Sequence, residues 1–107
     1  MKAKLIIHNK LTDEYGNTVE IKMWSVLKTE DKPYGFKYSL VYIVKGERVI
    51  GYDNAEKKGD HRHYKDREEA YHFVSLEKLA KDFYRDIEKL KKDTYENQKS
   101  KNRDTES

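Results

Sequence analysis

The chain has 107 residues, of which 36% are hydrophobic and 40% are charged, and its formal net charge is +3. Its length fits one small domain, and its near-neutral charge excludes a histone-like basic protein and an acidic disordered tail protein. It contains no cysteine and no apolar run of about 20 residues, which excludes a disulfide framework, a zinc knuckle, a thiol nucleophile and a membrane span. The first ten residues lack a signal-peptide core, so we expect a cytoplasmic protein.

The first two predicted elements are strands over residues 3–11 and 18–27, joined by the turn-rich segment 13–17. In both, apolar and polar side chains alternate with a period of two, which is typical of a strand with one buried face. The two strands therefore predict a β-hairpin, and its apolar positions are Leu5, Ile7, Leu11, Val19, Ile21 and Met23.

A second hairpin is predicted from residues 36–44 and 47–54, with a tight turn at 45–46. Residues 36–44 are β-branched and aromatic and are apolar on both faces, which is typical of a central strand. Gly51, inside the returning strand, indicates a bulge or a close approach of another part of the chain.

Residues 55–67 show no periodicity and predict a long loop, and long loops in small domains usually carry function. Residues 57–67 contain five basic and two acidic groups, so this one segment matches the net charge of the whole chain. A local basic patch attracts a polyanion such as RNA even when the whole molecule is almost neutral.

An amphipathic helix of about four turns is predicted from Ser75, which acts as the N-cap, to about residue 92. Beyond it, residues 93–107 are charged and almost free of apolar side chains, so we expect a frayed or disordered tail. The predicted fold class is α+β: residues 1–92 form a single domain, with an antiparallel sheet of about four strands (two β-hairpins) and one long C-terminal helix packed on one face. The apolar helix positions are Leu76, Leu79, Ala80, Phe83, Ile87 and Leu90.

The residues that best fit a chemical role are the two histidines of the basic segment. Histidine suits proton transfer because its pKa lies near operating pH, and arginine binds phosphate through two donors. We expect His61 and His63 to act as a general acid–base pair, with Arg62 and Tyr64 as further catalytic residues. If residues 61–64 are extended, the two histidines share one face and Arg62 and Tyr64 the other. The expected nucleic-acid-binding residues are Lys57, Lys58, Lys65, Arg67 and Tyr52, with Asp53 and Asp60 in supporting roles.

Three other interpretations remain open for the same residues. The His-x-His pair, with Asp53 or Asp60, can bind a divalent ion, although a third ligand at recognisable spacing is missing and we expect no metal or other cofactor. The cations can bind a phosphate backbone without catalysis. The histidines can also simply bond the backbone. Four tyrosines pose a related choice between stacking bases and filling the core, and the core is favoured: Tyr38, Tyr42, Tyr52 and Tyr64.

Three segments carry a resemblance to a known family: residues 51–54 (GYDN), 58–64 (KGDHRHY) and 73–79 (FVSLEKL). Together they resemble the TumE-type toxins of type II toxin–antitoxin pairs, over roughly residues 3–90. The resemblance implies a cognate antitoxin as protein partner, and RNA as target because small toxins of this class commonly cleave RNA. The leading hypothesis is a metal-independent endoribonuclease toxin that inhibits translation. The alternatives are a non-catalytic nucleic-acid- or protein-binding module and a metal-dependent nuclease or nucleotidyl-transferring toxin. Exposed strand edges also favour a homodimer. The motif positions that the resemblance marks are Asp60, His61, Arg62 and His63.

Overall fold

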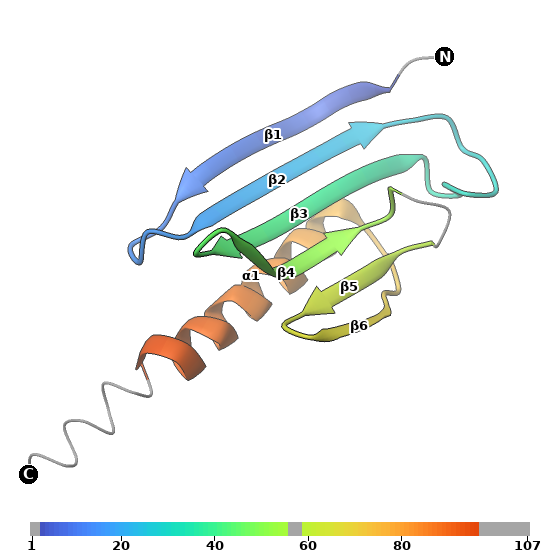
Figure 1. Ribbon diagram of the computed structural model, residues 1–107. Coiled ribbons are helices and arrows are strands. Elements are labelled where there is room, and N and C mark those ends of the chain that lie inside the picture. Colours follow the sequence, from blue (N-terminus) through green and yellow to red (C-terminus); the bar gives the residue numbers. More distant parts are fainter. Residues whose placement is uncertain (1–2, 56–58, 97–107) are drawn as a thin grey trace, which may run out of the picture. The chain divides into compact units, whose positions relative to one another are not determined.

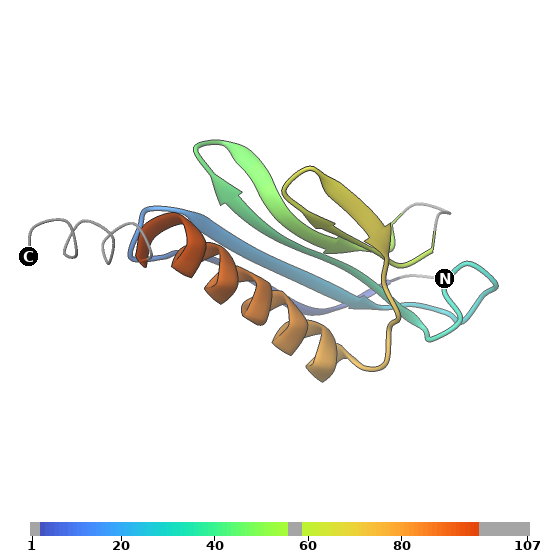
Figure 2. The ribbon, with the colours of Figure 1, turned by 90° about the horizontal axis from the view of Figure 1, so that it is seen from below.

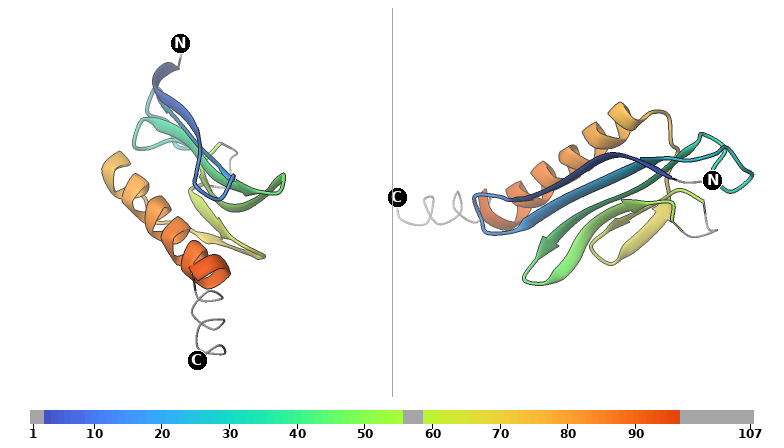
Figure 3. Two further views of the ribbon diagram at one scale, coloured as in Figure 1. Left: turned by 90° about the vertical axis from the view of Figure 1, so that its left-hand side faces the viewer. Right: turned by 90° about the horizontal axis from the view of Figure 1, so that it is seen from above.

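The computed structural model describes residues 3–55 and 59–96, which belong to two compact units. The first unit ends at Val74 and contains a β-sheet, and the second begins at Ser75 and contains the helix. The sheet has six strands in sequence order, each antiparallel to its neighbour. Figure 1 shows this order directly, and Figure 3 shows the twist of the sheet from two further directions. The strands are β1 (Lys4–Thr12), β2 (Thr18–Ser25), β3 (Phe36–Val44), β4 (Glu47–Asp53), β5 (His61–Tyr64) and β6 (Arg67–Ala70).

The sheet differs from the sequence-based expectation in its number of strands, which is six and not about four. The two additional strands, β5 and β6, lie largely within residues 55–67, which the sequence predicts to be a loop, and in the residues that follow. The error has a physical reason, because β5 carries two histidines and an arginine and therefore lacks the alternation of apolar side chains. Its register is set by backbone pairing with β4, and Lys65 at φ 56° makes the turn into β6.

The buried face of the sheet does not extend to β1, where the predicted core positions Leu5 and Leu11 are 58% and 56% exposed. Along β2–β5 one face of the sheet is buried, and its side chains form rows across the strands. Val19, Tyr42 and Ile50 form one such row, which Tyr64 continues on β5. All four large tyrosines of β3–β5 lie on this face and are at most 5% exposed, so they fill the core and offer no platform for stacking bases. The buried apolar positions on β2–β5 are Val19, Ile21, Met23, Tyr38, Leu40, Tyr42, Ile50, Tyr52 and Tyr64.

Polar partners satisfy the hydroxyl groups of the tyrosines on β3. Tyr42 donates a hydrogen bond to Asp13 (2.5 Å) and accepts one from the side-chain amide of Asn17 (3.0 Å), both in the turn between β1 and β2. Tyr38 donates to Asp60 just before β5 (2.6 Å). Buried tyrosines commonly pair their polar tip in this way, and here the pairs tie β3 to two separate turns.

The helical unit confirms the predicted C-terminal helix. α1 spans Leu76–Lys91 (Figure 2). The side chain of Ser75 accepts a hydrogen bond from the backbone N–H of Lys78, as an N-cap does. The helix continues through a π-helical turn at Lys92–Glu96. Its buried apolar residues recur at helical spacing: Leu79, Phe83, Ile87 and Leu90.

Two further predictions about the helical region stay predictions. They are the packing of α1 on one face of the sheet and the division of the chain at residue 92. Residues 97–107, where most of the predicted tail falls, lie outside the described residues. Within the part of the chain that is described, no helix has the length and apolarity needed to cross a membrane.

Candidate functional site

The candidate site lies on β4, β5 and β6, on the face of the sheet opposite the tyrosines. β5 is extended, so His61 and His63 point to the same face, as the sequence predicts for that conformation. The ladder places Asp53 opposite His61, and it places Gly51 and Glu68 on either side of His63. Figure 1 shows how these three short strands lie side by side at one end of the sheet.

His61 is held on both sides of its ring. Its Nε2 atom lies 3.0 Å from Oδ1 of Asp53 and 3.7 Å from Oε2 of Glu68. Its Nδ1 atom lies 3.2 Å from the carbonyl oxygen of Gly59. Because carboxylates and carbonyls only accept hydrogen bonds, the doubly protonated ring is the form that donates to partners on both sides. With 9% of the residue exposed, this ring is fixed in position.

His63 has a different environment from its neighbour. Its ring centroid lies 5.2 Å from that of His61 in an edge-to-face arrangement, and its Nε2 atom lies 3.0 Å from Oε2 of Glu68. Burial lowers the pKa of His63 below its usual value, and the positive charge of Arg48 lowers it further, while Glu68 acts in the opposite direction. The two histidines therefore share one small space but have unlike partners.

Arg48 is a member of this site that the sequence does not reveal. A bulge in the pairing of β3 and β4 sets Arg48 opposite Ile43, which turns its side chain to the face of the histidines. The chain of Arg48 then passes over Gly51, where a Cβ atom would lie 2.9 Å from Arg48 Cδ. Among the described residues no carboxylate forms an ion pair with Arg48, and its positive charge acts on His63. In the sequence, Gly51 inside a strand indicates that another part of the chain approaches closely, but it does not identify Arg48 as that part.

Arg62 and Tyr64, predicted as catalytic, lie on the opposite face of β5. Arg62 donates to the hydroxyl of Tyr52 (3.0 Å) and to Glu69 (3.2 Å), and its guanidinium carbon lies 5.0 Å from the Tyr64 ring centroid. Tyr52, predicted to bind nucleic acid, is 2% exposed. The structure thus brings these three residues together with one another and does not bring them to the histidines.

The remaining predicted residues are dispersed. Lys65 and Arg67 are exposed at the turn between β5 and β6, and Lys65 Nζ lies 5.9 Å from the Tyr64 ring centroid. Asp60 accepts the hydrogen bond from Tyr38. Lys57 and Lys58 lie outside the described residues. The cationic side chain that the structure adds next to the histidines is Arg48.

The same cluster also has the composition of a metal-ligand set. Ligand atoms of Asp53, His61 and His63 all lie within 4.8 Å of one another. The third ligand that is missing from the local sequence is supplied by β4, the neighbouring strand. On chemistry alone, the cluster can transfer protons, bind a phosphate or bind a metal ion.

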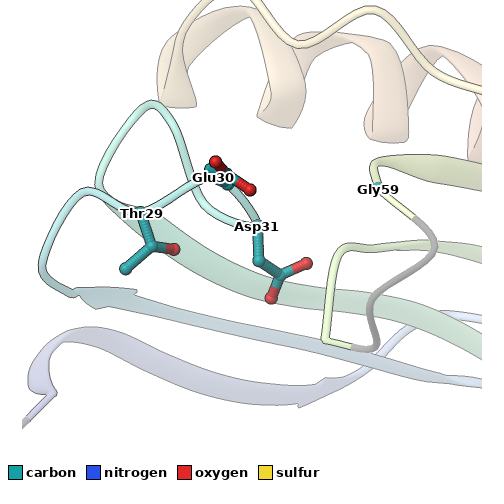
Figure 4. Close-up of a pocket in the computed structure, with 4 residues that line it drawn as sticks. All are labelled: Thr29, Glu30, Asp31 and Gly59. Carbon is teal, nitrogen blue, oxygen red and sulfur yellow. The ribbon is translucent and has the colours of Figure 1, made fainter.

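A separate open pocket lies where the β2–β3 connection approaches the segment that leads into β5. It is lined by Thr29, Glu30, Asp31 and Gly59 (Figure 4). Its charged groups are two carboxylates, of which Asp31 pairs with Lys32. Within the described residues this lining contains no cation to bind a phosphate substrate, so the histidine cluster is the better candidate.

Fold and site together describe a small α+β protein with a paired-histidine cluster on the polar face of its sheet. A family model described as Toxin TumE matches residues 2–91. The chain belongs to the TumE toxin family. Searches of curated proteins and of solved structures found no match.

Proposed function

We propose that this toxin is a metal-independent endoribonuclease, which stops translation in the cytoplasm by cleaving RNA. The observation that carries the proposal is geometric: two histidines of one strand and an arginine of the next converge on one polar face of the sheet. Proton-transfer groups beside a cation are what cleavage at an RNA phosphate requires. Family membership supports the toxin role and is silent on the chemistry.

The proposed reaction is an internal transfer at phosphorus. The RNA 2′-oxygen forms a bond to phosphorus and loses its proton to Nδ1 of His63, because Nε2 donates its proton to Glu68 and the lowered pKa favours the neutral ring. The bond from phosphorus to the 5′-oxygen breaks, and that oxygen takes a proton from His61. The products are a 2′,3′-cyclic phosphate and a free 5′-hydroxyl, and the protons balance between the two rings.

The other members of the site position the histidine rings and neutralise charge on the phosphate. Arg48 binds the non-bridging phosphate oxygens and stabilises the charge that builds up on them in the transition state. Asp53 holds the His61 ring and stabilises its positive charge. Glu68 is about half exposed and accepts a hydrogen bond from Nε2 of His63, which leaves Nδ1 of that ring to take the proton.

The family also supports a protein partner. We propose that a cognate antitoxin neutralises the chain by covering the histidine cluster, since covering it would block access of RNA. A homodimer through the free edges of β1 or β6 stays a prediction. A non-catalytic module that binds nucleic acid through a tyrosine-lined face has lost its main support, because those tyrosines are buried.

The test uses purified protein, end-labelled RNA and a buffer with EDTA. We expect wild-type protein to cleave, and His61→Ala and His63→Ala each to lose about 10²–10⁴-fold in rate, the usual contribution of general acid–base catalysis. The matched control is His8→Ala, because His8 also pairs with a carboxylate on the same sheet, Glu20 at 2.8 Å, but without a second histidine. Circular dichroism checks that each variant is folded.

Three results would contradict the proposal. Cleavage that survives in both site variants excludes the acid–base assignment. Loss of wild-type cleavage in EDTA indicates a metal-dependent nuclease. Incorporation of labelled nucleotide into RNA indicates a nucleotidyl-transferring toxin.

A further inference from the structure

The histidine cluster has a second chemical capability that RNA cleavage does not use. His61 Nε2 and His63 Nε2 both point at carboxylate oxygens, from Asp53 and Glu68 respectively. Donor atoms of Asp53, His61 and His63 all lie within 4.8 Å of one another, and Oε2 of Glu68 lies 3.7 Å from Nε2 of His61 and 3.0 Å from Nε2 of His63. Imidazole and carboxylate donors in this combination are typical of sites for zinc and neighbouring transition metals.

We infer that Asp53, His61 and His63 form a binding site for a divalent first-row transition metal ion such as Zn²⁺, with Glu68 as the fourth ligand. Zinc bonds to nitrogen and oxygen of about 2.0–2.2 Å in a tetrahedron place neighbouring ligand atoms about 3.3–3.6 Å apart. The observed separations are 3.0 Å from Asp53 to His61, 3.7 Å from His61 to Glu68 and 3.0 Å from His63 to Glu68. Four ligands have six mutual separations, and side-chain movements of a few tenths of an ångström bring these three to the tetrahedral value.

The surroundings of His61 resemble those of a metal ligand in a second respect. Metal-binding histidines usually bond their other ring nitrogen to a carbonyl or carboxylate, which fixes the ring and aims the free nitrogen at the ion. The Nδ1 atom of His61 has such a partner in the carbonyl of Gly59, 3.2 Å away. Gly59 holds a φ of +79°, which other residues adopt only with strain, so the backbone is shaped to present this carbonyl.

The donor set also selects the kind of ion. Mg²⁺ and Ca²⁺ prefer shells made of oxygen, and two imidazoles are poor ligands for them. Arg48 lies beside His63 and repels any cation, which weakens the site without removing a ligand. We therefore expect a moderate affinity for Zn²⁺ and none for Mg²⁺, and we expect removal of the Arg48 charge to tighten binding.

Metal binding has a consequence for the proposed nuclease. An ion bound to Nε2 of both histidines engages both imidazole rings and prevents them from exchanging protons with RNA, so Zn²⁺ acts as an inhibitor of cleavage. Binding of the ion does not depend on the proposed function, and only this inhibition does. Arg48→Ala separates the two, because it should weaken cleavage and strengthen zinc binding.

The experiment is isothermal titration calorimetry of untagged, EDTA-stripped protein with ZnCl₂ and, separately, MgCl₂. We expect one Zn²⁺ per chain and no Mg²⁺ signal. Asp53→Asn keeps the size of the side chain and should weaken Zn²⁺ binding by about 10–100-fold, and His63→Ala by at least as much. His8→Ala, which alters the pair with Glu20, and His72→Ala, at an exposed loop residue, are the matched controls and should bind as the wild type does.

The inference is overturned if wild-type protein binds no Zn²⁺, or if Asp53→Asn and His63→Ala bind it as tightly as the controls do. Cleavage is then measured with EDTA and with Zn²⁺. Zinc binding without any cleavage contradicts the proposed function alone. Cleavage that only begins on addition of Zn²⁺ supports the site and contradicts the metal-independent mechanism.

Discussion

The two faces of β5 differ in their contacts, although the strand has only four residues. Arg62 and Tyr64 point to the buried face, where the arginine bonds Tyr52 and stacks over the ring of Tyr64. His61 and His63 point to the polar face, where their partners are carboxylates. A single alternating strand thus divides one basic motif into a half that supports the sheet and a half that is free for chemistry.

This division teaches that charge density along the sequence is a poor guide to a phosphate site. Within the motif, Arg62 is the arginine nearest to both histidines in sequence, yet its guanidinium is bound to the core side of the sheet. Arg48 is 13 residues before His61 and reaches the histidines through strand pairing and the bulge in β4. If this division holds, substitutions on the buried face lower stability, and substitutions on the polar face lower activity.

The largest expected effect is on stability, from the buried face. Tyr52→Ala removes a ring that is 2% exposed and takes away the hydroxyl that accepts from Arg62. Large-to-small substitutions of buried aromatic residues cost about 3–5 kcal/mol of unfolding free energy. His63→Ala, on the other face of the same strand pair, should cost no more than about 1 kcal/mol, as for substitutions outside the core. Urea denaturation measures both, and equal losses would contradict the division.

An intermediate effect should distinguish the two arginines. Arg48→Met should lower kcat/KM for RNA by about 10–100-fold with little change in stability, because it removes charged hydrogen bonds of about 1.5–3 kcal/mol to the substrate alone. Arg62→Met should lower stability by a similar free energy and leave kcat/KM per folded molecule unchanged. Thermal denaturation and initial cleavage rates give the two readouts. If Arg62→Met reduced cleavage in fully folded protein, the arginine next to the histidines in sequence would be the catalytic one after all.

The sequence predicts most of the fold where burial follows a simple period. Val19, Ile21 and Met23 alternate with polar residues and are buried as expected. In β5 the only residue of ordinary core type is Tyr64, and the strand exists because β4 offers it backbone partners. Pairing of that kind depends on the neighbouring strand and leaves no local pattern to read.

For the site, the local part was predictable and the long-range part was not. The shared face of His61 and His63 follows from the two-residue period of any extended segment. The positions of Asp53 and Glu68 beside them depend on strand register, and that of Arg48 depends on a bulge. A bulge shifts every side chain beyond it to the other face, so one unrecognised residue is enough to hide a member of the site.

The smallest expected effect concerns neighbours on β2 that point to opposite faces, Glu20 on the polar face and Ile21 in the core. The hydrogen bond from His8 holds the pKa of Glu20 below its usual 4.5, and Lys22 and Lys10 act in the same direction against the effect of burial. Between that lowered pKa and 4.5 the unfolded chain binds more protons than the folded one, so stability rises with pH through this window. Glu20→Gln should therefore differ from wild type at neutral pH and converge with it as the pH falls below the lowered pKa.

Ile21→Val provides the uncharged counterpart one position along the strand. It removes a buried methyl group at the cost of about 0.5–1.5 kcal/mol, and this cost has no reason to change with pH. Urea denaturation of both variants and the wild type, repeated from about pH 3 to pH 7, compares the two faces directly. A pH-independent difference for Glu20→Gln would mean that the His8–Glu20 bond contributes nothing to folding. A pH-dependent difference for Ile21→Val would mean that the core face is coupled to titration on the polar face, and the two faces would then not be independent.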